Sequence, residues 1–261
     1  MRHPIGLAPD ILLPIPDRQW VSYAPATGWC GESSIQMIAL SLGAWLPQAF
    51  IHEIANVKHT DIWIEDVAFT LNALGLQATK IHEHVTSNAF IRQIISSLTN
   101  NHPVIVGCKV YPSDHPHANC DHIMPVVGCK GTGLYVNTNL PADVWKSVPH
   151  GQALIDDSGL LTKKPGFSFI NVQGEFYGFP VQSFVDANGY PVVVQAGKEE
   201  GVMTLSVTAS GLTSGTNYVL EQDDMLGSIE NLPFTATGTT QTWSITADCL
   251  QVAKFTVIQD G

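Results

Sequence analysis

Residues 28–47 read GWCGESSIQMIALSLGAWLP. Apolar residues in this stretch recur at the spacing of one helix face: Ile35, Ile38, Leu42 and Trp45. Residues 1–29 are rich in proline and turn-forming residues, so we expect an extended lead-in there and a helix that begins near Cys30 and stops at Pro47. The helix dipole and the unpaired backbone N–H groups at a helix N-terminus favour a thiolate, which makes Cys30 a candidate nucleophile.

Two further helical stripes and a run of strands follow. Asp61 is a candidate cap for a helix that ends before Gly75, and Ser87 for one that runs to Leu98. After Pro103 the pattern predicts strands at 103–110, 122–129, 133–138, 166–172, 179–186 and 190–196, with an irregular segment at 139–165. Helices followed by an antiparallel sheet predict an α+β fold.

The last part of the chain has a different pattern. GKEEG at 197–201 breaks the preceding one, and no helical stripe occurs beyond it. Alternating segments separated by turn residues predict strands at 202–209, 217–222, 234–237, 242–247 and 253–259. We therefore expect a larger domain over residues 1–197 and a small all-β, sandwich-like module over residues 198–261.

Composition limits the classes of function. The chain has 261 residues, 44% of them apolar, and a formal net charge of −11. Such a chain can bury a core but has no basic stripe to neutralise phosphates, so nucleic acid and anionic membranes are disfavoured as partners. No apolar run is long enough to span a membrane. The low lysine content and the Thr-, Gly- and Ser-rich residues after 200 suggest a secreted or extracellular protein.

The cysteines and histidines show no metal-binding spacing. Five cysteines, an odd number, leave at least one thiol outside intramolecular disulfides. Two readings stay open: five buried free thiols, or one reactive thiol with up to two disulfides, one of which would join Cys108 to Cys120. The polar loop 111–121 carries four potential ligands at irregular spacing, so we expect no metal and no cofactor; these are Asp114, His115, His117 and Asp121.

Two strands downstream of Cys30 carry residues that complement a thiol. His122 begins a strand directly after a polar loop, and a neutral imidazole there can take the proton of Cys30. The next strand carries Asn137, and Asn139 lies on the same face two residues later. Either amide can orient the imidazole through its second nitrogen.

The order of these residues resembles papain-like cysteine peptidases over about residues 18–140. The matching segments are WCGESS at 29–34, His122 with Gly128 six residues later, and YVNTN at 135–139. The sequence is most similar to the branch of bacteriocin-leader peptidases and more distantly similar to phytochelatin synthase. Alignment from Gly128 places Thr138 at the third position of the triad in that branch, whereas the residue types favour Asn137, with Asn139 second.

The resemblance implies a papain-like domain over residues 1–197 and a mechanism without a cofactor. Cys30 is expected to attack a peptide carbonyl and His122 to move the proton. Gln19, with the Cys30 backbone N–H, is expected to bind the oxyanion. The glutamine usual in the family is Ala24 here, and Glu32 adds a negative charge that disfavours a thiolate.

Two other functions compete with a peptidase acting on peptides or proteins. One is an inactive binding protein on the same fold, with the β module as its recognition surface for a partner. The other is a γ-glutamyl transpeptidase similar to phytochelatin synthase, which the absence of Cys-rich sequence disfavours.

Overall fold

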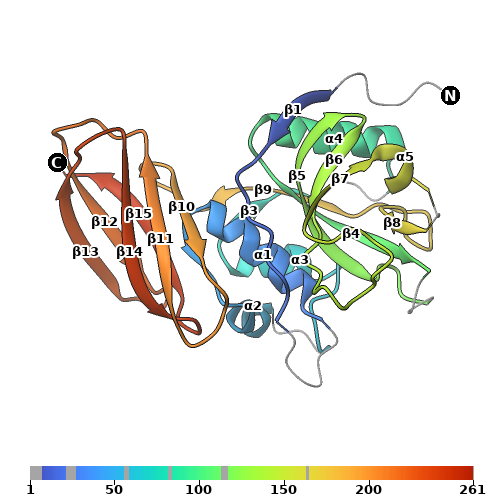
Figure 1. The fold of residues 1–261 in the computed structure, drawn as a ribbon, viewed down its shortest axis with the longest axis horizontal. Helices are drawn as coiled ribbons and strands as arrows, with labels where there is room; N and C mark the ends of the chain where they lie inside the picture. The colour runs from blue at the N-terminus through green and yellow to red at the C-terminus, as the bar shows by residue number, and fades with distance from the viewer. Residues whose placement is uncertain are drawn as a thin grey trace.

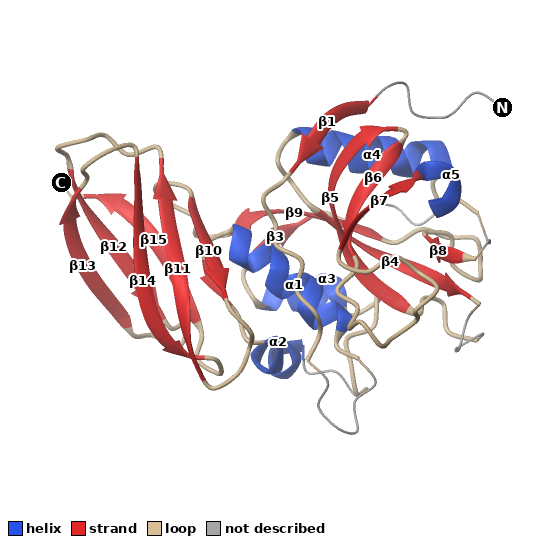
Figure 2. Cartoon of the chain, viewed as in Figure 1, coloured by secondary structure: helices blue, strands red, loops and turns tan. Residues whose placement is uncertain are grey.

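The computed structural model describes residues 8–21, 28–55, 59–81, 84–112, 117–162 and 165–260. Two bodies lie side by side: a larger one of helices around a sheet, and a smaller one made of strands (Figure 1, Figure 2). The chain has an α+β fold, as predicted. Among the described residues, no helix is both long and apolar enough to cross a membrane.

The larger body is built on an eight-stranded sheet. Its main order is β3-β9-β4-β5-β6-β7, while β1 pairs with β5 and β8 pairs with β4. The strands are β1 (Ala8–Leu12), β3 (Leu76–Ala78), β4 (Val104–Tyr111), β5 (His122–Gly131), β6 (Gly133–Asn137), β7 (Gln152–Asp156), β8 (Gly166–Ser168) and β9 (Gly178–Phe184). The strands β4 and β5 are buried over most of their length because helices cover them.

Helices pack around this sheet and differ in part from the prediction. They are α1 (Cys30–Ser41), α2 (Gln48–Ala55), α3 (Val67–Ala73), α4 (Ser87–Thr99) and α5 (Asp157–Leu160). Asp66, not Asp61, precedes α3, and the side chain of Thr86 caps α4. Helix α2 was not predicted, and Trp45 lies beyond α1 in the short strand β2 (Ala44–Trp45).

The smaller body is a sandwich of two sheets with its own apolar core. One sheet has the order β10-β11-β14 and the other β13-β12-β15-β2. The strands are β10 (Val192–Ala196), β11 (Val202–Ser210), β12 (Asn217–Asp223), β13 (Ile229–Thr235), β14 (Thr240–Asp248) and β15 (Ala253–Gln259). Strand β2 contributes Trp45 to this core, which the two sheets enclose.

Strand pairing moves the predicted boundary between the two bodies. Strand β10 was predicted to belong to the larger sheet, but it pairs with β11 from Val192↔Ala209 to Ala196↔Leu205. Residues 197–201 are therefore a hairpin loop within the β module and not a linker in front of it. The segment predicted to be irregular also contains β7 and α5, and the predicted strand 166–172 is limited to β8.

Candidate active site

Cys30 is the first residue of α1 and is buried. Its backbone N–H lies in the first turn, where no intrahelical acceptor exists. A Cβ on the next residue, Gly31, would lie 2.9 Å from the Cβ of Ile62, so only glycine allows this close approach of the chain. Cys30 thus lies at the start of a helix, as predicted.

Asn139 joins the helix of Cys30 to the strand of His122. Its buried Nδ2 donates to the carbonyl oxygen of Cys30 at 3.2 Å and to that of Ile123 at 3.0 Å. The same nitrogen lies 3.1 Å from Oγ of Ser34, whose single O–H lies between the same two carbonyl oxygens, 2.7 Å from that of Cys30 and 3.1 Å from that of Ile123. Asn139 has a φ of 48°, a left-handed conformation that asparagine tolerates better than most residues. Its role is thus to hold α1 against β5.

His122 is buried and is held by a backbone carbonyl. Its Nε2 lies 2.8 Å from the carbonyl oxygen of Thr138, which can only accept a hydrogen bond. In the neutral ring Nε2 must therefore carry the proton, and Nδ1 keeps its lone pair. Nδ1 is buried and has no hydrogen-bond partner among the described residues. This tautomer makes Nδ1 the nitrogen that can act as a base.

Asn137 does not orient this imidazole, contrary to the prediction. Its Nδ2 donates to the carbonyl oxygen of Ile15 at 3.0 Å, and its Oδ1 accepts from Nε2 of Gln152 at 3.0 Å. Both ends of the amide are thus occupied by the lead-in and by β7. The partner of the imidazole is instead the main-chain oxygen of Thr138.

Gln19 is not placed as an oxyanion donor. Its side chain is exposed, and among the described residues no hydrogen bond ties that side chain to Cys30. Its carbonyl oxygen accepts a hydrogen bond from Nε2 of Gln48 at 3.1 Å. Ala24, the position usual for this glutamine, lies outside the described residues.

Three aromatic rings surround the imidazole of His122. The centroid of Trp20 lies 5.7 Å and that of Trp145 5.6 Å from the imidazole centroid, both edge-on, and Phe167 lies roughly parallel at 5.7 Å. Trp20 also packs on Gly28, two residues before Cys30. These rings exclude water, and they leave His122 only 1% exposed. The imidazole is therefore closed off from solvent in this structure.

Burial keeps both candidate groups neutral in this closed form. It raises the pKa of the Cys30 thiol far above its usual range, and the nearby charge of Glu32 raises that pKa further. Burial also lowers the pKa of His122 to about 4, although the hydrogen bond to Thr138 opposes this change. A thiolate and an imidazolium both need solvation or a close partner. Among the described residues, no hydrogen bond joins Cys30 to Nδ1 of His122.

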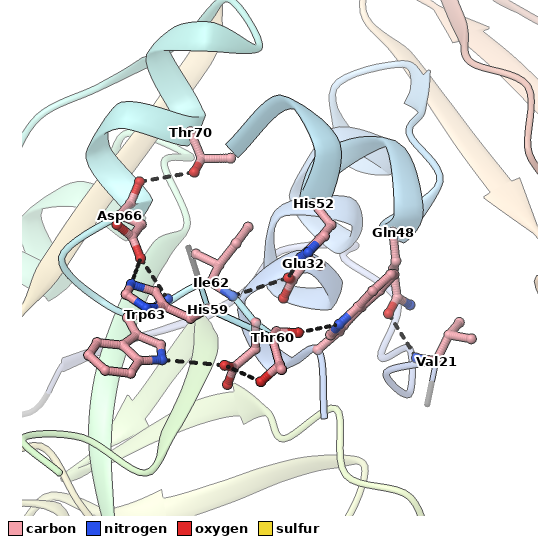
Figure 3. A network of polar contacts seen from close by, with 12 residues as sticks. Val21, Glu32, Gln48, His52, His59, Thr60, Ile62, Trp63, Asp66 and Thr70 are labelled. Carbon is pink, nitrogen blue, oxygen red and sulfur yellow. Dashed lines mark hydrogen bonds and ion pairs between the residues drawn. The ribbon is translucent and has the colours of Figure 1, made fainter. Parts of the chain in front are cut away.

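Glu32 brings a buried carboxyl group into the first turn of α1, close to Cys30. Its Oε1 accepts hydrogen bonds from Nδ1 of His52 at 2.8 Å and from the backbone N–H of Ile62 at 3.1 Å (Figure 3). Its Oε2 is buried without a partner among the described residues. Burial raises the pKa of Glu32 to about 7, and the contact with His52 opposes this rise.

Of the potential ligands in the loop 111–121, the structure describes His117 and Asp121. Asp121 forms a buried ion pair with Lys109, at 2.6 Å, and Asp114 and His115 lie outside the described residues. Within the described part of the chain, no three potential ligands gather around a common point. All five cysteines, including Cys108 and Cys120, are free thiols.

Sequence reasoning missed the groups that carry no side-chain signal. The acceptor on His122 is a backbone carbonyl, and Trp145 lies in the segment predicted to be irregular. Trp20 was noticeable as an aromatic residue upstream of Cys30, but its contact with His122 depends on the fold.

The sequence matches no protein-family model and no curated protein.

Proposed function

We propose that this protein is a papain-like cysteine peptidase that attacks a peptide bond of a peptide or protein through a thioester intermediate. One observation carries the proposal. His122 donates through Nε2 to the carbonyl of Thr138, which leaves Nδ1 with a lone pair that no described residue binds, on the strand whose next residue, Ile123, contacts the Cys30 thiol. A nucleophile, a base and an orienting acceptor are the three roles that thiol catalysis needs.

The steps follow from this tautomer. Nδ1 of His122 takes the proton of the Cys30 thiol, and Sγ attacks the substrate carbonyl carbon. The backbone N–H of Cys30, unpaired within α1, can donate to the oxyanion. The C–N bond then breaks, Nδ1 returns the proton to the leaving amine, and a thioester remains. Water hydrolyses the thioester in a peptidase, and a second amine takes the acyl group in a peptidyl transferase.

The closed form requires an opening step before catalysis. Trp20 and Trp145 cover the imidazole, so a substrate has to displace at least one of them. Water or substrate reaching the site would lower the pKa of Cys30 and raise that of His122, because burial is the main cause of both shifts. The ion pair of thiolate and imidazolium is expected only in the open form.

A second candidate function is favoured by the same burial. An inactive protein on this fold would keep Cys30 as a core thiol and use the β module to bind a partner. The buried Glu32, whose charge raises the pKa of Cys30, supports this alternative.

Thiol labelling distinguishes the two functions. The full chain is treated with an epoxide inhibitor of cysteine peptidases across pH, and the Cys30 peptide is followed by mass spectrometry. Cys249, a buried thiol of the β module, serves as the internal control. A peptidase labels selectively at Cys30 and loses this labelling in His122→Ala. Equal, slow labelling of Cys30 and Cys249 in the native protein contradicts the enzyme and favours the binding protein.

A further inference from the structure

Arg18 lies in the lead-in, two residues before Trp20, and its backbone and its guanidinium both form hydrogen bonds. Its backbone N–H contacts Sδ of Met37 at 3.3 Å, and its carbonyl oxygen accepts from Oγ of Ser33 at 2.9 Å. Its guanidinium donates through Nε to Oε1 of Gln36 at 3.0 Å and through Nη1 to the carbonyl of Ala196 at 2.9 Å. Arg18 therefore links α1 to the end of β10 in the β module.

Glu199, on the hairpin loop 197–201 of the β module, binds the same region from the other side. Its Oε2 accepts from Nε2 of Gln36 and its Oε1 from the backbone N–H of Gln48, both at 2.9 Å. Gln48 in turn holds the lead-in, since its Oε1 accepts from the N–H of Val21 at 2.8 Å (Figure 3) and its Nε2 donates to the carbonyl of Gln19 at 3.1 Å. The loop thus contacts the lead-in through two buried amides.

The charges at the two ends determine how the Gln36 amide is oriented. Arg18 can only donate and the Glu199 carboxylate can only accept, so Oε1 of Gln36 must face Arg18 and Nε2 must face Glu199. Nε2 of Gln48 also lies 3.3 Å from Oε1 of Gln36. The carbonyl oxygen of Leu46 also accepts from Nε2 of Gln36, at 2.8 Å, and favours the same orientation. An uncharged residue in place of Glu199 would therefore weaken the contact between the hairpin loop and Gln36 without reversing the amide.

Trp20 lies between the two residues that this network holds most directly. Its backbone N–H donates to the carbonyl of Asn139 at 3.1 Å, and its ring covers His122 and packs on Gly28. The positions of Arg18 and Val21 therefore determine where the indole of Trp20 lies. The guanidinium of Arg18 contacts the β module directly, and Val21 is held by Gln48, which the β module contacts through Glu199; α1 holds the backbone of Arg18 as well.

We propose that Glu199 and Arg18 are positioning residues through which the β module holds Trp20 over the site of Cys30 and His122. The inference rests on the proposed function for its catalytic meaning. It gives the β module a role in the peptidase itself: the hairpin loop 197–201 keeps the lead-in closed on the imidazole. Loosening this loop opens the site.

The test compares full-length variants of two neighbouring glutamates. Glu199→Gln keeps the shape of the side chain and removes the charge. Glu200→Gln is the matched control, because Glu200 is exposed on the same loop and pairs only with the exposed Lys198 among the described residues. Arg18→Met tests the other end of the network. Hydrogen exchange of the amides of residues 18–21 and alkylation of Cys30 by iodoacetamide across pH are the measurements.

Glu199→Gln and Arg18→Met are expected to speed exchange at Val21 about tenfold, which corresponds to a local loss of about 1.4 kcal/mol. They are expected to speed Cys30 alkylation by a similar factor and to lower its pH midpoint, because solvent then reaches the thiol. Exchange in β11 and β14 stays as in the wild type if the module remains folded. Where Glu199→Gln unfolds the module, Glu199→Asp, which keeps the charge on a shorter side chain, replaces it and gives a smaller effect in the same direction.

The failure of this inference is distinguishable from failure of the proposed function. The inference is overturned if hydrogen exchange at residues 18–21 and alkylation of Cys30 are as fast in Glu200→Gln as in Glu199→Gln and Arg18→Met. This outcome does not depend on what the protein catalyses. Alkylation of wild-type Cys30 that does not change in His122→Ala counts against the peptidase alone, because exchange and alkylation report the position of Trp20 without turnover.

Discussion

Trp29 and His52 stack face to face, with ring centroids 4.7 Å apart and planes 7° from parallel. Trp29 directly precedes Cys30, and His52 binds the carboxyl group of Glu32. The stacked pair thus connects the backbone at the candidate nucleophile to the acidic side chain that faces it. Burial is the main reason why the pKa of the Cys30 thiol is raised, and a negative charge on Glu32 raises it further.

Removing the charge of Glu32 is expected to activate Cys30. Glu32→Gln keeps an acceptor for Ile62 and removes a negative charge that raises the pKa of the thiol. Each unit by which the pKa of Cys30 falls gives about a tenfold larger thiolate fraction below the midpoint. The pH dependence of iodoacetamide alkylation at Cys30 measures the change. Glu53→Gln, on the exposed side of α2, is the control, and an unchanged midpoint in Glu32→Gln contradicts the prediction.

The burial of His122 makes the stability of the fold depend on pH. Its pKa is about 4 in the folded chain and ordinarily 6.5, so between these values the unfolded chain binds a proton that the folded chain does not. The free energy of unfolding therefore rises as pH increases through this window, by about 3 kcal/mol at most. Urea unfolding at several pH values should show this rise in the wild type relative to His122→Gln. A difference between the two that does not vary with pH contradicts it.

Glu32 is expected to contribute a slope of the opposite sign. Its pKa is about 7 in the folded chain and ordinarily 4.5, so in this window the folded chain keeps a proton that the unfolded chain has lost. The free energy of unfolding falls as pH increases from about 4.5 to 7, by roughly 3 kcal/mol at most. The same unfolding series on Glu32→Gln should lack this fall, and a parallel curve for wild type and variant would disprove the assignment.

Trp145 is expected to limit access to the site. Its φ of 41° holds it in the left-handed region, and its ring contacts both His122 and Trp20. Trp145→Ala removes part of the cover, so alkylation of Cys30 should speed up several-fold. Trp63→Ala is the control, because Trp63 is 52% exposed and stacks on His59. Equal rates in the two variants show that Trp145 does not close the site.

Asn139 and Asn137 are expected to differ in their effects. Asn139→Ala removes the amide donor of the buried carbonyls of Cys30 and Ile123 and leaves Oγ of Ser34 as their side-chain partner, which costs about 1 kcal/mol for each lost hydrogen bond. It should reduce any His122-dependent reactivity of Cys30. Asn137→Ala should reduce the free energy of unfolding without changing the pH profile of alkylation. Identical pH profiles in both variants contradict this division of roles.

Local patterns were sufficient to place Cys30 and His122. The apolar spacing after Gly31 predicts α1 with Cys30 at its start, and the β-branched run before Gly128 predicts the strand that His122 begins. The orienting group was predicted as a side chain, because residue types indicate side chains only. The actual acceptor, the main-chain oxygen of Thr138, has the same chemistry in every residue and leaves no trace in the sequence.

The pairing of strands and the structure of irregular segments were harder to predict from the sequence. The sequence of strand β10 has the apolar pattern of an ordinary buried strand. This pattern does not indicate that it pairs with β11 rather than with the larger sheet. Helix α2 is short, follows Pro47 closely and was missed for that reason. Trp145 covers part of His122. Its position depends on tertiary contacts of a segment whose sequence has no helical or strand periodicity.

The two-residue strand β2 has a consequence for how this protein is made. Ala44 and Trp45 lie between α1 and α2, yet they pair with Lys254 and Ala253 of β15, and the indole of Trp45 donates to the carbonyl of Cys249. During synthesis the ribosome produces Trp45 long before β15, so this large apolar side chain stays uncovered while most of the chain is translated. The helix that carries Cys30 gains its final support only when β15 has emerged. A chain truncated before β15 would lack a finished β module and the cover of Trp45 and Leu40, so α1 would be incompletely packed in a shortened translation product.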